Sequence, residues 1–138
     1  MSPDPVTIHI CTSCRSEGEA LEPRSERAGA RLCAALSAAA ADGPTPVAIV
    51  PVDCMSVCKR PVTVGFSAPG KWTYVYGDFA NAPVETAAAI ILDGAARYAA
   101  APDGLIPWKE RPEALKRGVI VRLPPSAAPR TDDPASAG

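Results

Sequence analysis

The chain has 138 residues, which is the length of one domain. Its 14 Lys and Arg residues nearly balance its 15 Asp and Glu residues, and the formal net charge is -1. This balance argues against a protein that binds nucleic acid through phosphate contacts. The single histidine, His9, excludes sites that need two imidazole ligands, such as HExxH zinc proteases and Rieske clusters.

The amino terminus carries no basic run followed by a long apolar stretch, so we expect no signal peptide. No apolar segment reaches the length of a membrane span, so we expect no membrane association. The chain is therefore expected to be cytoplasmic, where thiols stay reduced. Five cysteines in such a chain indicate a role other than structural disulfides.

Two strands separated by a helix are predicted in the first third of the chain. Val6–Ile10 alternates apolar and polar residues and leads into a cysteine. From about Pro23 to Ala41, Ala and Leu residues recur three and four apart, as in a helix that ends at Asp42–Pro44. Val47–Val52 is a continuous apolar run, typical of a strand buried on both faces of a parallel sheet.

A hairpin and a second helix follow. Val62–Phe66 and Trp72–Tyr76 are joined by a Ser, Pro and Gly turn and are predicted to pair antiparallel. The segment from Pro83 to about Ala101 has the apolar spacing of a helix. Residues 104–125 form a mixed segment with a short helical piece near Glu113–Arg117.

The predicted order is β-α-β-β-β-α, the order of a thioredoxin-like α/β fold. We expect a mixed four-stranded sheet flanked by helices, with a carboxyl-terminal extension. The first two strands, joined through a helix, should be parallel neighbours. We assign residues 1–125 to this domain and 126–138, rich in Ser, Ala, Pro and Asp, to a disordered tail.

Two cysteine pairs follow the two predicted parallel strands. Cys11 and Cys14 form C-x-x-C after the first strand, and Cys54 and Cys58 form C-x-x-x-C after the second. The carboxyl ends of neighbouring parallel strands meet at one edge of a sheet, where open α/β sheets place their sites. We therefore expect the four thiols to lie together.

Four thiolates suit either a [2Fe–2S] cluster or one Zn²⁺ ion, and spacing alone does not separate the two. Lys59 and Arg60 follow the second pair and Arg15 follows the first. Such cations favour the reduced, more negative form of a cluster. For Arg15, an ordinary solvated surface charge is an equal alternative.

A third interpretation takes Cys11 and Cys14 as a redox dithiol. It leaves Cys54 and Cys58 unexplained, and the acidic residues after Cys14 would raise the thiol pKa. Cys33 lies within the first predicted helix, where a free cysteine packs as a small apolar residue. It stays an alternative fourth ligand to Cys14.

The residues resemble the DUF1636 proteins of bacteria over about positions 6 to 125. Those proteins are described as metal-binding and as relatives of the thioredoxin-like [2Fe–2S] ferredoxins. The resemblance rests on Ile10–Arg15, Val52–Pro61, Trp72–Asp78, Gly104–Trp108, Arg111–Pro112 and Val121–Pro125.

By this resemblance Cys11, Cys54 and Cys58 are ligands. The ferredoxins place their second ligand about a dozen residues after the first, whereas Cys14 follows after three, so Cys14 rests on the chemistry of this chain. The resemblance also implies a homodimer as one arrangement. Some relatives lie beside cobalamin genes, but no residue here indicates a corrin role.

The sequence as a whole predicts an electron carrier rather than an enzyme. Its cofactor would be a [2Fe–2S] cluster held by Cys11, Cys14, Cys54 and Cys58, and its partners would be redox proteins. A zinc protein that uses the same four thiolates, with a structural or metal-handling role, is the alternative, and a dithiol oxidoreductase is the third.

Overall fold

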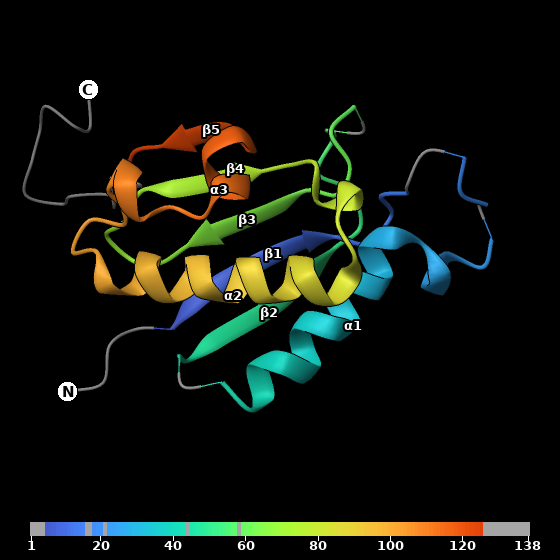
Figure 1. Cartoon of the computed structure of the whole chain (residues 1–138), viewed down its shortest axis with the longest axis horizontal. Helices are drawn as coiled ribbons and strands as arrows, with labels where there is room; N and C mark the ends of the chain where they lie inside the picture. The colour runs from blue at the N-terminus through green and yellow to red at the C-terminus, as the bar shows by residue number, and fades with distance from the viewer. Residues whose placement is uncertain (1–4, 16–17, 21, 44, 58, 126–138) are drawn as a thin grey trace, which may run out of the picture.

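A mixed sheet forms one layer of the computed structural model (Figure 1). The structure describes residues 5–15, 18–20, 22–43, 45–57 and 59–125. Within them, five strands lie in the order β2-β1-β3-β4-β5. The strands are β1 (Val6–Cys11), β2 (Val47–Val52), β3 (Val64–Ser67), β4 (Thr73–Tyr76) and β5 (Val119–Leu123).

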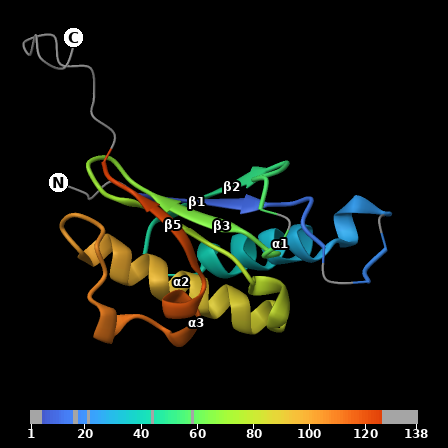
Figure 2. The same cartoon turned by 90° about the horizontal axis from the view of Figure 1, so that it is seen from above.

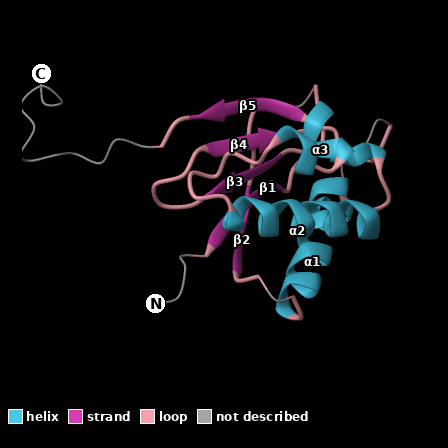
Figure 3. Cartoon of the chain, turned by 60° about the vertical axis from the view of Figure 1, so that its left-hand side comes forward, coloured by secondary structure: helices cyan, strands magenta, loops and turns pink. Residues whose placement is uncertain are grey.

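Helices lie on one side of this sheet, as Figure 2 shows from above and Figure 3 from a turned view. The α-helices are α1 (Ala28–Ala41), α2 (Val84–Ala100) and α3 (Glu113–Arg117), and the 3-10 turns are η1 (Arg24–Glu26), η2 (Phe79–Asn81) and η3 (Trp108–Glu110). The predicted mixed α/β order and the short helix at Glu113–Arg117 are thereby confirmed. No helix in the described part of the chain is long and apolar enough to cross a bilayer.

The parallel pairing of β1 with β2 is confirmed, with α1 as the crossover between them. Cys11 lies opposite Val52, so the two strands end at the same level. On its other side β1 pairs antiparallel with β3, and β3, β4 and β5 continue antiparallel. The segments that follow β1 and β2 therefore leave the sheet at one edge.

The expected four-stranded sheet is wrong by one strand. Val119–Leu123, within the segment predicted to be mixed, pairs antiparallel with β4 as a fifth strand. Val121 and Leu123 are 41% and 52% exposed, so β5 has no clear alternation of buried and exposed positions. A strand at the edge of a sheet, half exposed, leaves little pattern in its sequence.

The expectation that β2 is buried on both faces is also wrong. Its residues alternate between half-buried and exposed, and Val50 is 37% exposed. The reason is position, because β2 lies at the edge of the sheet and the described helices cover one face (Figure 2). A short apolar run does not distinguish an edge strand from a central one.

The first helix begins later than predicted. Arg27 has an extended backbone, with φ -66° and ψ 152°, and separates the turn η1 from α1. The α-helix therefore starts at Ala28 and not near Pro23. This late start places the helix amino terminus next to the turn that carries Cys11 and Cys14, since the Gly29 amide donates to the Cys14 carbonyl at 3.0 Å.

The core lies between the sheet and the helices. Ile8 and Ile10 of β1 point inward and are fully buried, while alternate residues of β1 lie on the other face. An aromatic cluster fills the β3–β4 side, with Phe66 edge-on to Tyr76 at 5.3 Å between ring centres. Such buried contacts, made at alternate strand positions and every third or fourth helical residue, orient the sheet against its helices.

Leucine truncations test this division of the sheet. Leu36 of α1 is fully buried, whereas Leu123 of β5 is 52% exposed. Leu36→Ala should lower the free energy of unfolding by about 2–5 kcal/mol, because it leaves a cavity in the core. Leu123→Ala removes the same atoms and should cost about 1 kcal/mol or less. Urea unfolding of both variants measures the difference, and equal losses would contradict the assigned core.

Candidate metal centre

Three segments meet at the edge of the sheet where β1 and β2 end. The Cys11 amide donates to the Thr63 carbonyl at 3.0 Å, and the Thr12 amide donates to the Val52 carbonyl at 2.8 Å. The turn after β1 is therefore joined both to the end of β2 and to the residue before β3. Main-chain hydrogen bonds alone therefore connect the three segments at this edge.

Cys11 and Cys14 bring their sulfurs into contact at this edge. The Cys14 thiol donates to the Cys11 sulfur at 2.9 Å, and both residues are buried, at 2% and 7% exposure. The Ser13 hydroxyl lies 3.6 Å from the Cys11 sulfur. The C-x-x-C motif thus forms a tight turn whose two thiols point to the same place.

The two thiols differ in acidity. Burial raises the pKa of Cys11, but the hydrogen bonds that its sulfur accepts outweigh burial and leave that pKa below its ordinary value. The bonds come from the side chains of Cys14 and Ser13 and from the backbone of Met55 and Cys14. Burial, followed by the hydrogen bond and charge of Cys11, raises the pKa of Cys14 to about 12.

Cys54 lies on the segment that follows β2. Its side chain is exposed, and its sulfur accepts the Ser56 amide at 3.3 Å. The backbone of the next residue, Met55, helps to lower the pKa of the Cys11 thiol. Met55 also covers the outer face of β3, because its Cε lies 3.6 Å from where a Cβ on Gly65 would stand. The residue after Cys54 thus lies against the sheet, while Cys54 itself is exposed.

The remaining cysteines are placed differently. Cys58 lies outside the described residues. Cys33 is half-buried in α1 and packs against the core, and burial raises its pKa. Across the residues that the structure describes, no three His, Cys, Asp or Glu side chains form a group that could hold a metal ion. Of the predicted ligands, the structure brings Cys11 and Cys14 into contact.

Gly29 explains how closely α1 approaches this turn. A Cβ on Gly29 would lie 2.0 Å from the Cys11 carbonyl oxygen, which is far inside any real contact. The Gly29 amide meanwhile donates to the Cys14 carbonyl at 3.0 Å. The helix start and the cysteine turn are fitted to each other through a residue without a side chain.

Charged side chains fasten the loop between Cys14 and α1. Glu19 accepts the Ala28 amide at 2.8 Å and pairs with Arg31 at 2.9 Å, so its carboxylate caps the first turn of α1. Arg27 donates to the Ser13 carbonyl at 3.2 Å. These contacts keep the C-x-x-C turn seated on the helix.

A fully buried hydroxyl lies beside the cysteine pair. Thr63 is 0% exposed, and its hydroxyl has no ordinary hydrogen-bond partner in the described part of the chain. Its side chain and backbone lower the pKa of Cys14, against the larger effect of burial. A buried donor without a strong acceptor indicates a place where a thiolate or an added group would be stabilised.

The predicted cations lie in different settings. The Arg60 guanidinium makes structural contacts, because it binds the Asp78 carboxylate at 2.6 Å and also donates to the Arg117 carbonyl. Arg15 is exposed and donates to the Glu19 carbonyl at 2.8 Å. Lys59 is exposed beside the second cysteine pair. Arg60 and Arg15 thus position main chain as well as carrying charge.

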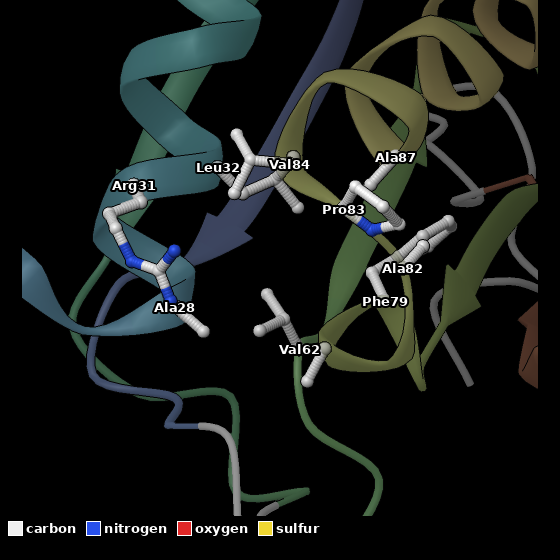
Figure 4. A pocket seen from close by; sticks show the side chains of 10 residues that line it. Ala28, Arg31, Leu32, Val62, Phe79, Ala82, Pro83, Val84 and Ala87 are labelled. Carbon is white, nitrogen blue, oxygen red and sulfur yellow. The ribbon is translucent and has the colours of Figure 1, made fainter. Parts of the chain in front are cut away.

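A cavity of about 200 Å³ lies on the helix side of the same edge (Figure 4). Leu32, Val62 and Val84 project into it between the first turns of α1 and α2, and Arg31 stands at its side (Figure 4). Among its described lining residues there is no cysteine or carboxylate. The cavity therefore offers no ligands to a metal, and the candidate centre stays at the thiols.

Sequence reasoning missed three contributors to this site. Gly29, Thr63 and the Met55 backbone all act through close packing or main-chain direction. Of these, Gly29 alone leaves a signal, because glycine in the first turn of a helix indicates a close backbone approach. Thr63 and Met55 carry no such signal.

The Gly29 contact gives a direct test of how α1 supports the cysteine turn. Gly29→Ala should separate the helix from the turn and lower the stability of the chain by about 1–3 kcal/mol. Gly43→Ala is the matched control at the other end of α1, since its Cβ would meet nothing nearer than 3.6 Å. Thermal unfolding measures both, and equal effects would contradict the contact.

The hydrogen bond between the thiols predicts a pKa change. Cys14→Ala removes the donor from the Cys11 sulfur, so the pKa of Cys11 should rise above its value in the metal-free chain. Cys14→Ser keeps a donor and should raise that pKa less. NMR titration of a chain labelled at the cysteine Cβ measures each thiol separately. An unchanged Cys11 in both variants would show that the contact does not form.

The fold resembles a solved structure, a thioredoxin-like [2Fe–2S] ferredoxin from Aquifex aeolicus. The TM-score is 0.53 and the identity 18%, and the match covers 91% of this chain and 99% of that one. The predicted thioredoxin-like fold is therefore confirmed. No curated protein matches the chain. The family model DUF1636, a family of unknown function, matches residues 8–125, and the chain belongs to that family.

Proposed function

We propose that this protein binds one [2Fe–2S] cluster through Cys11, Cys14, Cys54 and Cys58 and carries single electrons. The observation that supports the proposal most strongly is the meeting of the two cysteine segments. The Thr12 amide, in the turn after Cys11, donates to the Val52 carbonyl at 2.8 Å, so the segments that carry the two cysteine pairs leave the sheet side by side although they are far apart in the chain. In this proposal the protein makes and breaks no substrate bond.

The donor set fits a thiolate-bound metal centre. Two sulfurs on one tetrahedral metal stand about 3.8 Å apart, given metal–sulfur bonds of about 2.3 Å. Cys11 and Cys14 are at 2.9 Å, so the pair would have to open by about 0.9 Å. Rotation about side-chain bonds supplies a movement of this size. The buried Thr63 hydroxyl would then face a full thiolate instead of a thiol.

Backbone and hydroxyl donors already surround the sulfurs. The Ser13 hydroxyl lies 3.6 Å from the Cys11 sulfur, and the Cys54 sulfur receives the Ser56 amide at 3.3 Å. Donors directed at ligand sulfurs stabilise negative charge and raise the potential of a cluster. When bound, a [2Fe–2S] cluster supplies one-electron chemistry, and these groups would favour its more negative state.

The proposed ligands differ in their exposure to solvent. Cys11 and Cys14 are buried, whereas Cys54 is exposed with Lys59 nearby in the chain. The side of Cys54 is therefore the side at which a redox partner protein could approach most closely. We propose that partners bind there, with Lys59 meeting an acidic surface.

The fold neighbour supports iron–sulfur chemistry over zinc. That protein is named as a thioredoxin-like [2Fe–2S] ferredoxin, and the match covers nearly all of both chains. The four-thiolate set alone would suit Zn²⁺ equally well. The metal therefore has to be measured.

Metal analysis of the full chain, prepared anaerobically from iron-replete cells, tests the proposal. We expect about two irons and two acid-labile sulfides per chain, a brown colour and an EPR signal on reduction. Cys11→Ser should lose most of the cluster. Cys33→Ser is the matched control, and it should keep the spectrum, because Cys33 packs within α1.

Three results would count against this assignment. A colourless, iron-free protein would remove it, and about one zinc per chain without sulfide would replace it with a four-thiolate zinc centre. Loss of the cluster in Cys33→Ser but not in Cys14→Ser would show that Cys33, and not Cys14, is the fourth ligand.

A further inference from the structure

We propose that Cys11 and Cys14 form an oxidation site of their own, at which hydrogen peroxide joins them in a disulfide when no metal is bound. The proposal concerns the metal-free chain and does not depend on which metal the protein takes. It rests on the contact between the two sulfurs and on their burial. These two features single out Cys11 and Cys14 from the other described cysteines.

The contact distance lies between two chemical states. Sulfurs in a disulfide stand about 2.05 Å apart, and sulfurs sharing a tetrahedral metal stand about 3.8 Å apart. The Cys11 and Cys14 sulfurs, at 2.9 Å, lie about midway. The same turn can therefore close to a bond or open to a metal with a movement of less than about 1 Å in either direction.

The main chain holds the turn ready for bond formation. Its two ends are fixed, because the Cys11 amide donates to Thr63 and the Cys14 carbonyl accepts the Gly29 amide, each at 3.0 Å. The two sulfurs lie within a turn whose ends are already fixed, so little conformational freedom is lost when a disulfide bond forms between them. Cys11 and Cys14 are three positions apart in the chain. A bridge between them would therefore close only this one turn and leave the strand pairing unchanged.

Burial selects a small oxidant. Cys11 and Cys14 are 2% and 7% exposed, which leaves no room for a bulky disulfide such as oxidised glutathione to line up with either sulfur. Hydrogen peroxide is close to water in size and needs only a transient opening. The exposed Cys54 is the described thiol that a bulky disulfide would reach.

The chemistry balances with peroxide alone. One thiol attacks hydrogen peroxide, the O–O bond breaks, and a sulfenic acid and one water are formed. The second sulfur then attacks the first, the S–O bond breaks, the S–S bond forms and a second water leaves. Two thiols lose two electrons and two protons in total, and peroxide takes up both.

Digestion of the chain with trypsin separates this pair from every other cysteine. Arg15 is the first basic residue, so one peptide holds residues 1–15 with Cys11 and Cys14. Residues 32–59 form another peptide, which holds Cys33, Cys54 and Cys58. A disulfide within residues 1–15 lowers the mass of that peptide by about 2 Da without joining it to another.

The experiment treats the full, reduced, metal-free chain with a small excess of peroxide, blocks the remaining thiols and digests it. We expect most of the 1–15 peptide to be lighter by about 2 Da and unblocked, and to return to its reduced mass with dithiothreitol. Cys33→Ser should behave in the same way. In Cys14→Ser, Cys11 should instead carry sulfenic or higher oxidation products.

A parallel sample with oxidised glutathione should label the 32–59 peptide and leave residues 1–15 unmodified. Two outcomes would overturn the proposal. One is a 1–15 peptide with both thiols blocked after peroxide, and the other is the loss of mass in the 32–59 peptide alone. Because metal is absent, these results stand whether or not the protein proves to carry an iron–sulfur cluster.

Discussion

The structure depends on the parallel pairing of β1 with β2, which ends both strands at the same level. Cys11 stands opposite Val52 in this pairing. Because the chain leaves both strands at one edge, residues about 40 positions apart in sequence come into contact there, as the Thr12–Val52 hydrogen bonds show. A slip of the strands along each other would separate Thr12 from Val52 without unfolding either strand. The candidate site therefore depends on the register in which β1 and β2 pair.

The helix start gives this edge its second constraint. Gly29 lets α1 lie against the Cys11 carbonyl, and Glu19 caps the helix from the loop that joins the two. The turn is thus held between a strand and a helix end, which limits its motion. Candidate sites built on such rigid neighbours keep their ligands in place more precisely than sites on free loops.

The sequence was enough to predict what depends on local pattern. The alternation in Val6–Ile10, the helical spacing before Ala41 and the hairpin turn near Gly70 all predict the elements that form. Patterns failed at the sheet edges. The continuous apolar run of β2 hides its alternation of half-buried and exposed positions, and β5 has no clear alternation of burial at all.

Candidate ligands were predictable from cysteine spacing, but their surroundings were not. The motif predicts that Cys11 and Cys14 share one turn, and the strand order predicts that the segment carrying Cys54 leaves the sheet at the same edge. The 2.9 Å contact, the unequal acidity of the two thiols and the buried hydroxyl of Thr63 depend on packing across three segments. The hydrophobic periodicity of the sequence does not predict such tertiary contacts.

Met55 connects two surfaces that otherwise have little in common. Its backbone helps to lower the pKa of Cys11, while its side chain lies over Gly65 on the side of the sheet away from the helices. A larger side chain at position 65 would therefore meet this methionine on the outer face of the sheet. The packing of the open face and the acidity of an interior thiol thus depend on one residue.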